Sequence, residues 1–216
     1  MAAATGARQG GTVIDGFEKD AWERHWQEAL GQDVLADVPS PYLAAETGEL
    51  RPGTALDAGC GTGADAVRLA ERGWAVTGVD IAPTALAAAA ERAARTGVAV
   101  RWLEADLTTW APEAAFDLVL TGYAHASIPQ LELYRRLGEW VAPGGTLLIV
   151  GHSGHPGAAG HDDEPPEESR VTLPAVTALF PGPAWRIRTA RESAAAVPGH
   201  PVRHHDVIVR VERLRA

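Results

Sequence analysis

The chain has 216 residues, a formal net charge of −9 and a pI near 5.3. This length suits one α/β domain with a full core, and the acidic balance argues against a general nucleic-acid or anionic-membrane binder, which needs clustered Lys and Arg. The single cysteine excludes an internal disulfide. No N-terminal apolar run has the length of a signal peptide or membrane span, so we expect a cytoplasmic protein.

The N-terminal region divides into a polar tail and a helical cap. Residues 1–12 are small and polar, which predicts a mobile tail, and residues 13–216 are expected to form the single domain. Apolar residues then recur with helical spacing at Phe17, Ala21, Trp22, Trp26, Ala29 and Leu30. With a second short helix predicted between Pro39 and Leu50, residues 13–50 form a cap that precedes the core.

The stretch from residue 54 to 63 has the composition of a cofactor loop. A short apolar strand ends at Asp57, and three glycines follow at alternate positions, Gly59, Gly61 and Gly63. Glycines with this spacing let the backbone turn tightly and approach a ligand, and the helix predicted from Ala64 presents its free N–H groups there. The same residues also fit the dinucleotide fingerprint with its last glycine replaced by Ala64, so the loop alone leaves two cofactors open.

Strands and helices alternate through the centre of the chain. The pattern predicts helices over 64–72, 83–95 and 128–141, and strands over 74–79, 98–103, 116–121 and 146–150. Gly73 and Gly97 are expected to end the first two helices, and Ser127 with Gln130 to form a capping box for the third. Such alternation predicts a parallel sheet with helices on both faces.

The composition changes abruptly after Val150. Residues 151–170 are rich in Gly, Pro and acids, so this segment is expected to be either a lid over the site or a disordered loop. Beyond it the pattern predicts a helix near 173–180 and strands near 185–190 and 207–211.

Acids and glycines recur in a fixed order along the predicted strands. After the glycine loop, Asp80 closes the second strand, Asp106 follows the third, Asp117 begins the fourth, and Pro143-Gly144-Gly145 precedes the fifth. As an ordered set over about residues 50–151, these segments resemble the class I S-adenosylmethionine (SAM) dependent methyltransferases. The resemblance implies a Rossmann-like, doubly wound α/β sheet of seven mostly parallel strands, with an antiparallel last strand and N-terminal helices.

The resemblance also implies the cofactor contacts. The three loop glycines would lie along the methionine and ribose of SAM, with Asp57 at the aminocarboxypropyl end. Asp80 would accept the ribose hydroxyls, and Asp106 with Leu107 would adjoin the adenine. Cys60 is expected to pack beneath the loop, since no partner residue marks it as a nucleophile. The expected cofactor residues are Asp57, Gly59, Cys60, Gly61, Gly63, Asp80, Ile81, Ala105, Asp106 and Leu107.

A general base is expected beyond the ends of the fourth and fifth strands. Tyr123 and His125 follow the fourth strand and His152 follows the fifth, so neighbouring strands would bring the three to one rim. Histidine suits proton transfer near neutral pH, although a structural role is an equal alternative for each. The N-terminal helices of the resembled family cross the mouth of the site, which implies substrate contacts, or simple docking, for Trp22, His25 and Trp26.

Two segments rich in histidine and acids, within residues 152–163 and 200–206, offer a metal site as an alternative. Neither has tight ligand spacing on a regular element. Metal-dependent catechol-type methyltransferases carry an acid after the fourth strand, where this chain has Thr121-Gly122-Tyr123. The sequence therefore predicts no metal.

On this resemblance, the leading prediction is an enzyme that transfers a methyl group from SAM to an oxygen, nitrogen or sulfur of a small molecule. The alternatives are a NAD(P)-dependent oxidoreductase and a non-catalytic SAM-binding protein. The expected partner is a small methyl acceptor, with no nucleic acid and no membrane, and the expected state is a monomer or homodimer.

Overall fold

A mostly parallel β-sheet runs through the part of the chain that the computed structural model describes, which comprises residues 16–31, 38–154, 167–196 and 203–215. The strand order is β3-β2-β1-β4-β5-β8-β7, and the short β6 pairs with β5 off this path. The strands are β1 (Thr54–Ala58), β2 (Ala75–Asp80), β3 (Val100–Glu104), β4 (Phe116–Gly122), β5 (Val141–Ser153), β6 (Arg170–Val171), β7 (Trp185–Ala196) and β8 (Arg203–Arg213).

The direction of the strands confirms the predicted fold class. The neighbours from β3 through β5 are all parallel, whereas β8 is antiparallel to both β5 and β7. The last strand is therefore antiparallel, as expected. Because β1 pairs with both β2 and β4, the strand order reverses beside β1, and ligands in such sheets lie at the carboxyl ends of these strands.

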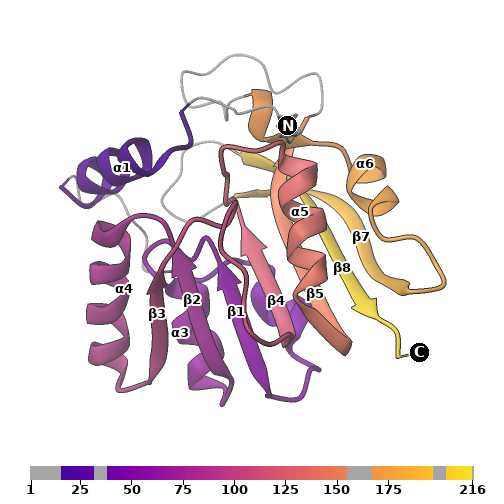
Figure 1. Cartoon of the computed structure of the whole chain (residues 1–216), viewed down its shortest axis with the longest axis horizontal. Coiled ribbons are helices and arrows are strands. Elements are labelled where there is room, and N and C mark those ends of the chain that lie inside the picture. Colours follow the sequence, from indigo (N-terminus) through magenta and orange to yellow (C-terminus); the bar gives the residue numbers. More distant parts are fainter. Residues whose placement is uncertain (1–15, 32–37, 155–166, 197–202, 216) are drawn as a thin grey trace, which may run out of the picture.

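Helices cover both faces of the sheet and one of its ends. Figure 1 shows α5 in front of the sheet, α3 behind it, and α1 beyond the upper ends of the strands beside α4. The helices are α1 (Lys19–Gly31), α2 (Leu43–Thr47), α3 (Ala64–Glu71), α4 (Pro83–Thr96), α5 (Gln130–Glu139) and α6 (Leu173–Ala178), with a 3₁₀ turn at Glu167–Ser169. None of the helices within the described ranges is long and apolar enough to cross a membrane.

The core consists of two apolar layers, because successive side chains of a strand point to opposite faces of the sheet. The layer that includes α5 contains the buried residues Leu56, Val119, Leu133, Leu137, Leu147 and Val209. The layer that includes α3 contains Ala55, Ala66, Leu69, Leu118, Leu148 and Ile208. Both faces of the central strands are thus buried, and polar chemistry is left to the strand ends.

The prediction of a capping box of Ser127 and Gln130 at the helix now seen as α5 is wrong. The helix α5 begins at Gln130, and its N-cap residue is Pro129, which provides no side-chain cap. The side chain of Gln130 instead donates to the carbonyl of Ala124 and contacts His125. The stop expected at the end of α4 is right, since Gly97 follows the helix with a φ of 73°.

The start of the predicted lid is part of the sheet. β5 continues through Ser153, where a loop was expected over 151–170, because Gly151 and His152 pair with Val207 and Asp206 of β8. Residues 155–166 of the predicted lid lie outside the described ranges. So does the tail predicted over residues 1–12.

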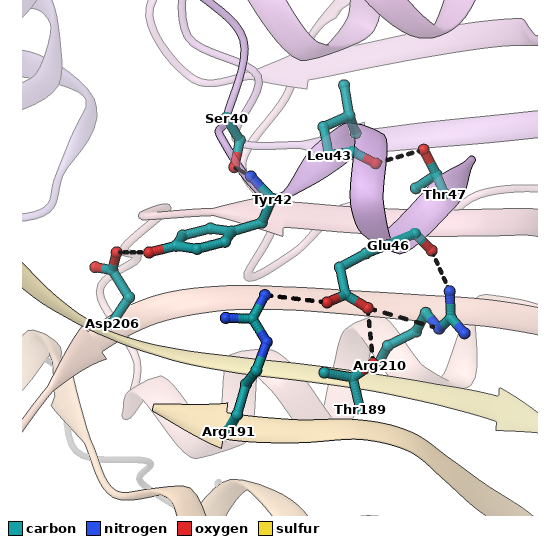
Figure 2. A network of polar contacts seen from close by, with 9 residues as sticks. All are labelled: Ser40, Tyr42, Leu43, Glu46, Thr47, Thr189, Arg191, Asp206 and Arg210. Carbon is teal, nitrogen blue, oxygen red and sulfur yellow. Dashed lines mark hydrogen bonds and ion pairs between the residues drawn. The ribbon is translucent and has the colours of Figure 1, made fainter. Parts of the chain in front are cut away.

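A buried polar network ties α2 to the two C-terminal strands (Figure 2). The carboxylate of Glu46, which is 5% exposed, accepts a hydrogen bond from Thr189 at 2.7 Å and pairs with Arg191 at 3.3 Å. Arg210 donates to the backbone carbonyl of Glu46. The network fixes the helical cap that precedes β1 against the opposite half of the sheet.

Candidate functional site

The glycine loop joins β1 to α3 at the point where the strand order reverses. Gly59, Gly61 and Gly63 have φ values of 74°, 50° and 75°, which favour glycine. The N–H groups of Gly59 and Cys60 both donate to the carbonyl of Val79, at 2.8 and 3.0 Å. The loop is therefore fixed to the end of β2.

Each of the three glycines allows close packing of another part of the chain. A Cβ atom on Gly59 would lie 2.3 Å from Ala124, and one on Gly63 would lie 2.5 Å from the ring of Trp102. A Cβ atom on Gly61 would lie 2.8 Å from the ring of Trp26 in α1. The loop thus lies against the segment after β4 on one side and against α1 on the other.

Asp80 ties the glycine loop to the turn after β2, with one carboxylate oxygen bonded to each. Oδ2 accepts from the N–H of Gly61 at 2.8 Å, and Oδ1 accepts from the N–H of Ala82 at 3.0 Å. Burial raises the pKa of Asp80, although both hydrogen bonds oppose this. A carboxylate oxygen has more than one lone pair, so each can also accept a ribose hydroxyl.

Asp57 is a buried carboxylate whose charge is poorly compensated. It is 3% exposed, and its Oδ2 atom has no hydrogen-bond partner among the described residues. Burial raises the pKa of Asp57, as do the neighbouring carboxylates of Asp65 and Asp80. A ligand with a cationic group, such as the ammonium of SAM, fits this orphaned oxygen beside the glycine loop.

The residues expected to adjoin the adenine lie beside Asp80. The N–H of Ala105 donates to the carbonyl of Asp80 at 3.0 Å, and Oδ1 of Asp106 accepts from the N–H of Thr108 at 2.8 Å, which shapes the turn after β3. Leu107 is buried in this turn, whereas Ile81, after β2, is half-buried.

Cys60 is buried beneath the loop, and burial raises the pKa of its thiol, which disfavours the nucleophilic thiolate.

Side chains from three parts of the chain meet at the carboxyl ends of β4 and β5. Tyr123 and His152 have ring centroids 4.7 Å apart, and those of His125 and His152 are 5.5 Å apart. From the N-terminal side, Phe17 lies 5.4 Å and Trp22 6.3 Å from His125. His25 connects Trp22 to Trp26, with ring distances of 5.4 and 5.1 Å. We call this set the aromatic cluster: Phe17, Trp22, His25, Trp26, Tyr123, His125 and His152.

The aromatic cluster brings together the candidate base residues and the candidate substrate contacts that the sequence placed in separate segments. It adds Phe17, which the sequence reading placed only on the helical stripe. Sequence reasoning missed Gln130 as a partner of the cluster. Its Oε1 atom lies 2.9 Å from Nδ1 of His125. Burial lowers the pKa of His125. The ring is therefore neutral at neutral pH.

Tyr123 has an unusual backbone and a charged neighbour. Its φ of 56° is the one positive value found outside glycine in the described residues, and such a conformation persists only where the surroundings enforce it. Burial raises the pKa of Tyr123, and the carboxylate of Asp206 adds to the shift. Asp206 lies opposite His152 in the pairing of β5 with β8 and accepts the hydroxyl of Tyr42 at 2.6 Å (Figure 2).

The metal alternative finds no site in the part of the chain that is described. No group of three or more His, Cys, Asp or Glu side chains there is arranged to hold a metal ion. Most of the segment 152–163, together with His200, lies outside the described residues.

The chain is similar to proteins that are named methyltransferases. Residues 55–145 match the family model of a methyltransferase domain. The chain is 38% identical over 133 residues to an uncharacterized methyltransferase of Mycobacterium tuberculosis, covering 59% of this chain and 61% of that protein. It is 33% identical over 136 residues to a probable thiol methyltransferase of Arabidopsis thaliana, covering 60% of each.

A solved structure is similar over a longer stretch. It concerns the conversion of a disulfide bond into a thioacetal group during echinomycin biosynthesis, and is 28% identical with a TM-score of 0.61, covering 82% of each chain. The match to the two methyltransferases named above is shorter. The chain spans 61% of the length of the Mycobacterium tuberculosis protein and 60% of that of the Arabidopsis thaliana protein.

Proposed function

We propose that this chain, which belongs to the class I SAM-dependent methyltransferases, transfers a methyl group from SAM to an oxygen, nitrogen or sulfur of a small molecule. One observation carries the proposal. Gly59 of the cofactor loop packs on Ala124, the residue before His125. The glycine loop and the aromatic cluster are therefore adjacent, as a methyl donor and its acceptor require.

The cofactor side of the proposal uses the residues around the loop. Asp57 would pair with the ammonium group of SAM, Asp80 would accept the ribose hydroxyls, and Asp106 with Leu107 would adjoin the adenine. SAM supplies an electrophilic methyl group on a sulfonium sulfur. The chain contributes binding and orientation, with the loop held in advance by the hydrogen bonds from its N–H groups to Asp80 and Val79.

The acceptor side of the proposal uses the aromatic cluster. Its rings offer flat surfaces for an acceptor, and His125 would act as general base, with Tyr123 and His152 orienting the acceptor. Trp22, His25 and Trp26 would contribute from α1. The probable thiol methyltransferase and the disulfide-to-thioacetal structure among the relatives support sulfur as one of the acceptor atoms.

The experiment is a pair of binding and turnover measurements. Calorimetry with SAM, its demethylated product and NAD(P) should give binding for the first two and none for the third. Methyl transfer from labelled SAM to a panel of thiols, phenols and amines then separates an enzyme from a protein that only binds SAM. Binding of NAD(P) with no binding of SAM would instead support the oxidoreductase alternative.

A further inference from the structure

We infer that Gln130 is a positioning residue that holds His125 in a single neutral tautomer, with the hydrogen on Nδ1 and the lone pair on Nε2. We infer further that an oxygen or sulfur acceptor at this site is a weakly acidic thiol or phenol and not an aliphatic alcohol. The second step rests on the proposed methyl transfer, whereas the first concerns only the two side chains.

The orientation of the Gln130 amide is set by a group that can only accept. The Nε2 atom of Gln130 donates to the backbone carbonyl of Ala124 at 2.9 Å, so the amide oxygen must face the opposite way. There it lies 2.9 Å from Nδ1 of His125. An amide oxygen cannot donate, so Nδ1 carries the hydrogen, and in a neutral ring Nε2 is left as the acceptor.

Burial makes this arrangement specific. Gln130 is 5% exposed, so water competes little for either end of its amide. Its position as the first residue of α5, directly after Pro129, holds it near the segment that follows β4. Removal of the amide would leave the carbonyl of Ala124 without this donor and would leave either ring nitrogen of His125 free to carry the hydrogen.

The groups around the His125 ring leave it a weak base. Phe17 and Trp22 face it from the N-terminal side and do not ionise, Gln130 faces it from α5 and carries no charge, and the titratable ring of His152 faces it from β5. Burial lowers the pKa of His125. A carboxylate in the place of Gln130 would favour the imidazolium and raise this pKa.

A weak base limits which acceptors it can activate. Each unit by which the pKa of the acceptor exceeds that of the base reduces the ionised fraction tenfold. Against an imidazole with the ordinary pKa of about 6.5, the deficit is roughly 10²-fold for a thiol and roughly 10³- to 10⁴-fold for a phenol, and the lowered pKa of His125 makes each deficit larger. For a hydroxyl as weakly acidic as water, at about 15.7, it is roughly 10⁹-fold. A neutral imidazole whose free nitrogen is Nε2, with no carboxylate beside its ring, therefore favours a thiol or phenol over an aliphatic alcohol.

The reaction balances with these groups alone. The proton of the acceptor passes to Nε2 of His125, and the electron pair left on the acceptor atom forms the bond to the methyl carbon. The sulfonium sulfur keeps the electron pair of the broken carbon–sulfur bond. The imidazolium then releases its proton to solvent, so that one proton is produced for each methyl group transferred.

The tautomer is tested without turnover, by ¹⁵N NMR of the histidine rings, with His125→Ala to assign the signals. We expect hydrogen on Nδ1 of His125 in the unmodified protein and a shift towards Nε2–H in Gln130→Leu. Gln130→Glu should keep Nδ1–H and raise the pKa of His125 by about one unit or more. Glu132→Leu, an exposed position in the same helical turn, is the matched control. Hydrogen on Nε2 in the unmodified protein, or no change in Gln130→Leu, would overturn the assignment.

The acceptor class is tested with benzyl mercaptan, phenol and benzyl alcohol, which are similar in size. We expect transfer to the mercaptan or the phenol and at least about 100-fold less transfer to the alcohol. In Gln130→Leu we expect a kcat that is about tenfold or more lower, at an unchanged KM for SAM. Equal rates with the alcohol would overturn the acceptor class. Transfer to an amine but to none of these three would also overturn the acceptor class, whereas failure of the proposed function would appear as no transfer to any thiol, phenol or amine, and the NMR result would still decide the role of Gln130.

Discussion

The carboxylate of Glu23 in α1 accepts hydrogen bonds from both the backbone N–H and the hydroxyl of Thr84 in α4. The N-cap residue of α4, Ala82, provides no side-chain cap, so Glu23 satisfies an N–H in the first turn of α4 from another helix. The helix α1 contains no buried residue. Together with the ion pair of Lys19 and Glu104, this contact fastens α1 beside the cofactor loop.

Glu23→Ala should release α1 from α4. We expect faster amide hydrogen exchange over residues 19–31 and in the first turn of α4, while Glu28→Ala, exposed on the same helix, should leave exchange unchanged. The Thr84 hydroxyl holds the pKa of Glu23 below its usual value, so the contact is present above about pH 4.5 and is lost as the pH falls through the pKa of the folded state. Unchanged exchange in Glu23→Ala would show that other contacts hold α1.

Gly61 and Trp26 should be energetically coupled. Gly61→Ala would place a Cβ atom 2.8 Å from the Trp26 ring on a backbone with a φ of 50°, so we expect both a clash and backbone strain. Trp26→Ala in the same protein should remove the clash and leave the strain. Urea denaturation of the two single variants and the double variant should give a coupling of about 0.5 to 3 kcal/mol, and strict additivity would contradict the contact.

Asp80→Ala should weaken SAM binding by about 1 to 3 kcal/mol in calorimetry, because the loop loses its support and the ribose its acceptors. Asp117→Ala is the control. Asp117 makes two comparable hydrogen bonds, to the N–H and hydroxyl of Thr54 at 2.8 and 3.0 Å, but it lies at the opposite end of the strands. We expect Asp117→Ala to lower stability without changing SAM affinity; an equal loss of affinity would remove Asp80 from the cofactor site.

Asp57→Asn should stabilise the ligand-free protein at pH 7 by about 0.5 to 2 kcal/mol while weakening SAM binding. Burial raises the pKa of Asp57 and that of Asp65, the latter to about 6, so the folded state holds these protons to higher pH than the unfolded state does. Stability therefore falls as the pH rises from about 4 through the folded pKa values, and Asp57→Asn should flatten this decline. A loss of stability in Asp57→Asn at pH 7 would contradict this account, with the exposed Asp20→Asn as control.

Most of the fold was predictable because its central strands and helices are marked locally. Alternating strands and helices, the stop at Gly97 and the glycine loop all depend on residues close together in sequence. The acidic residues at the strand ends could be placed for the same reason. In a parallel sheet, carboxyl ends share one edge, so the meeting of Tyr123, His125 and His152 followed from topology.

The partners missed by the sequence depend on contacts that no local pattern marks. Gln130 resembled a helix cap, yet its amide bonds to Ala124 and His125, because α5 begins later than the polar residues before it suggested. Asp206 belongs to an alternating strand at the other end of the chain, and only the pairing of β8 with β5 brings it beside His152. Tyr42, which precedes α2, donates its hydroxyl to the same carboxylate.

The network around Glu46 also constrains how the chain is assembled during translation. Glu46 leaves the ribosome 143 residues before Thr189 and 145 before Arg191, the side chains that meet its carboxylate in the finished sheet. Until β7 and β8 have been synthesised, the carboxylate has neither of these partners and is left to water. The contacts of α2 with β7 and β8 are therefore expected to form late on the nascent chain, after the central strands have paired.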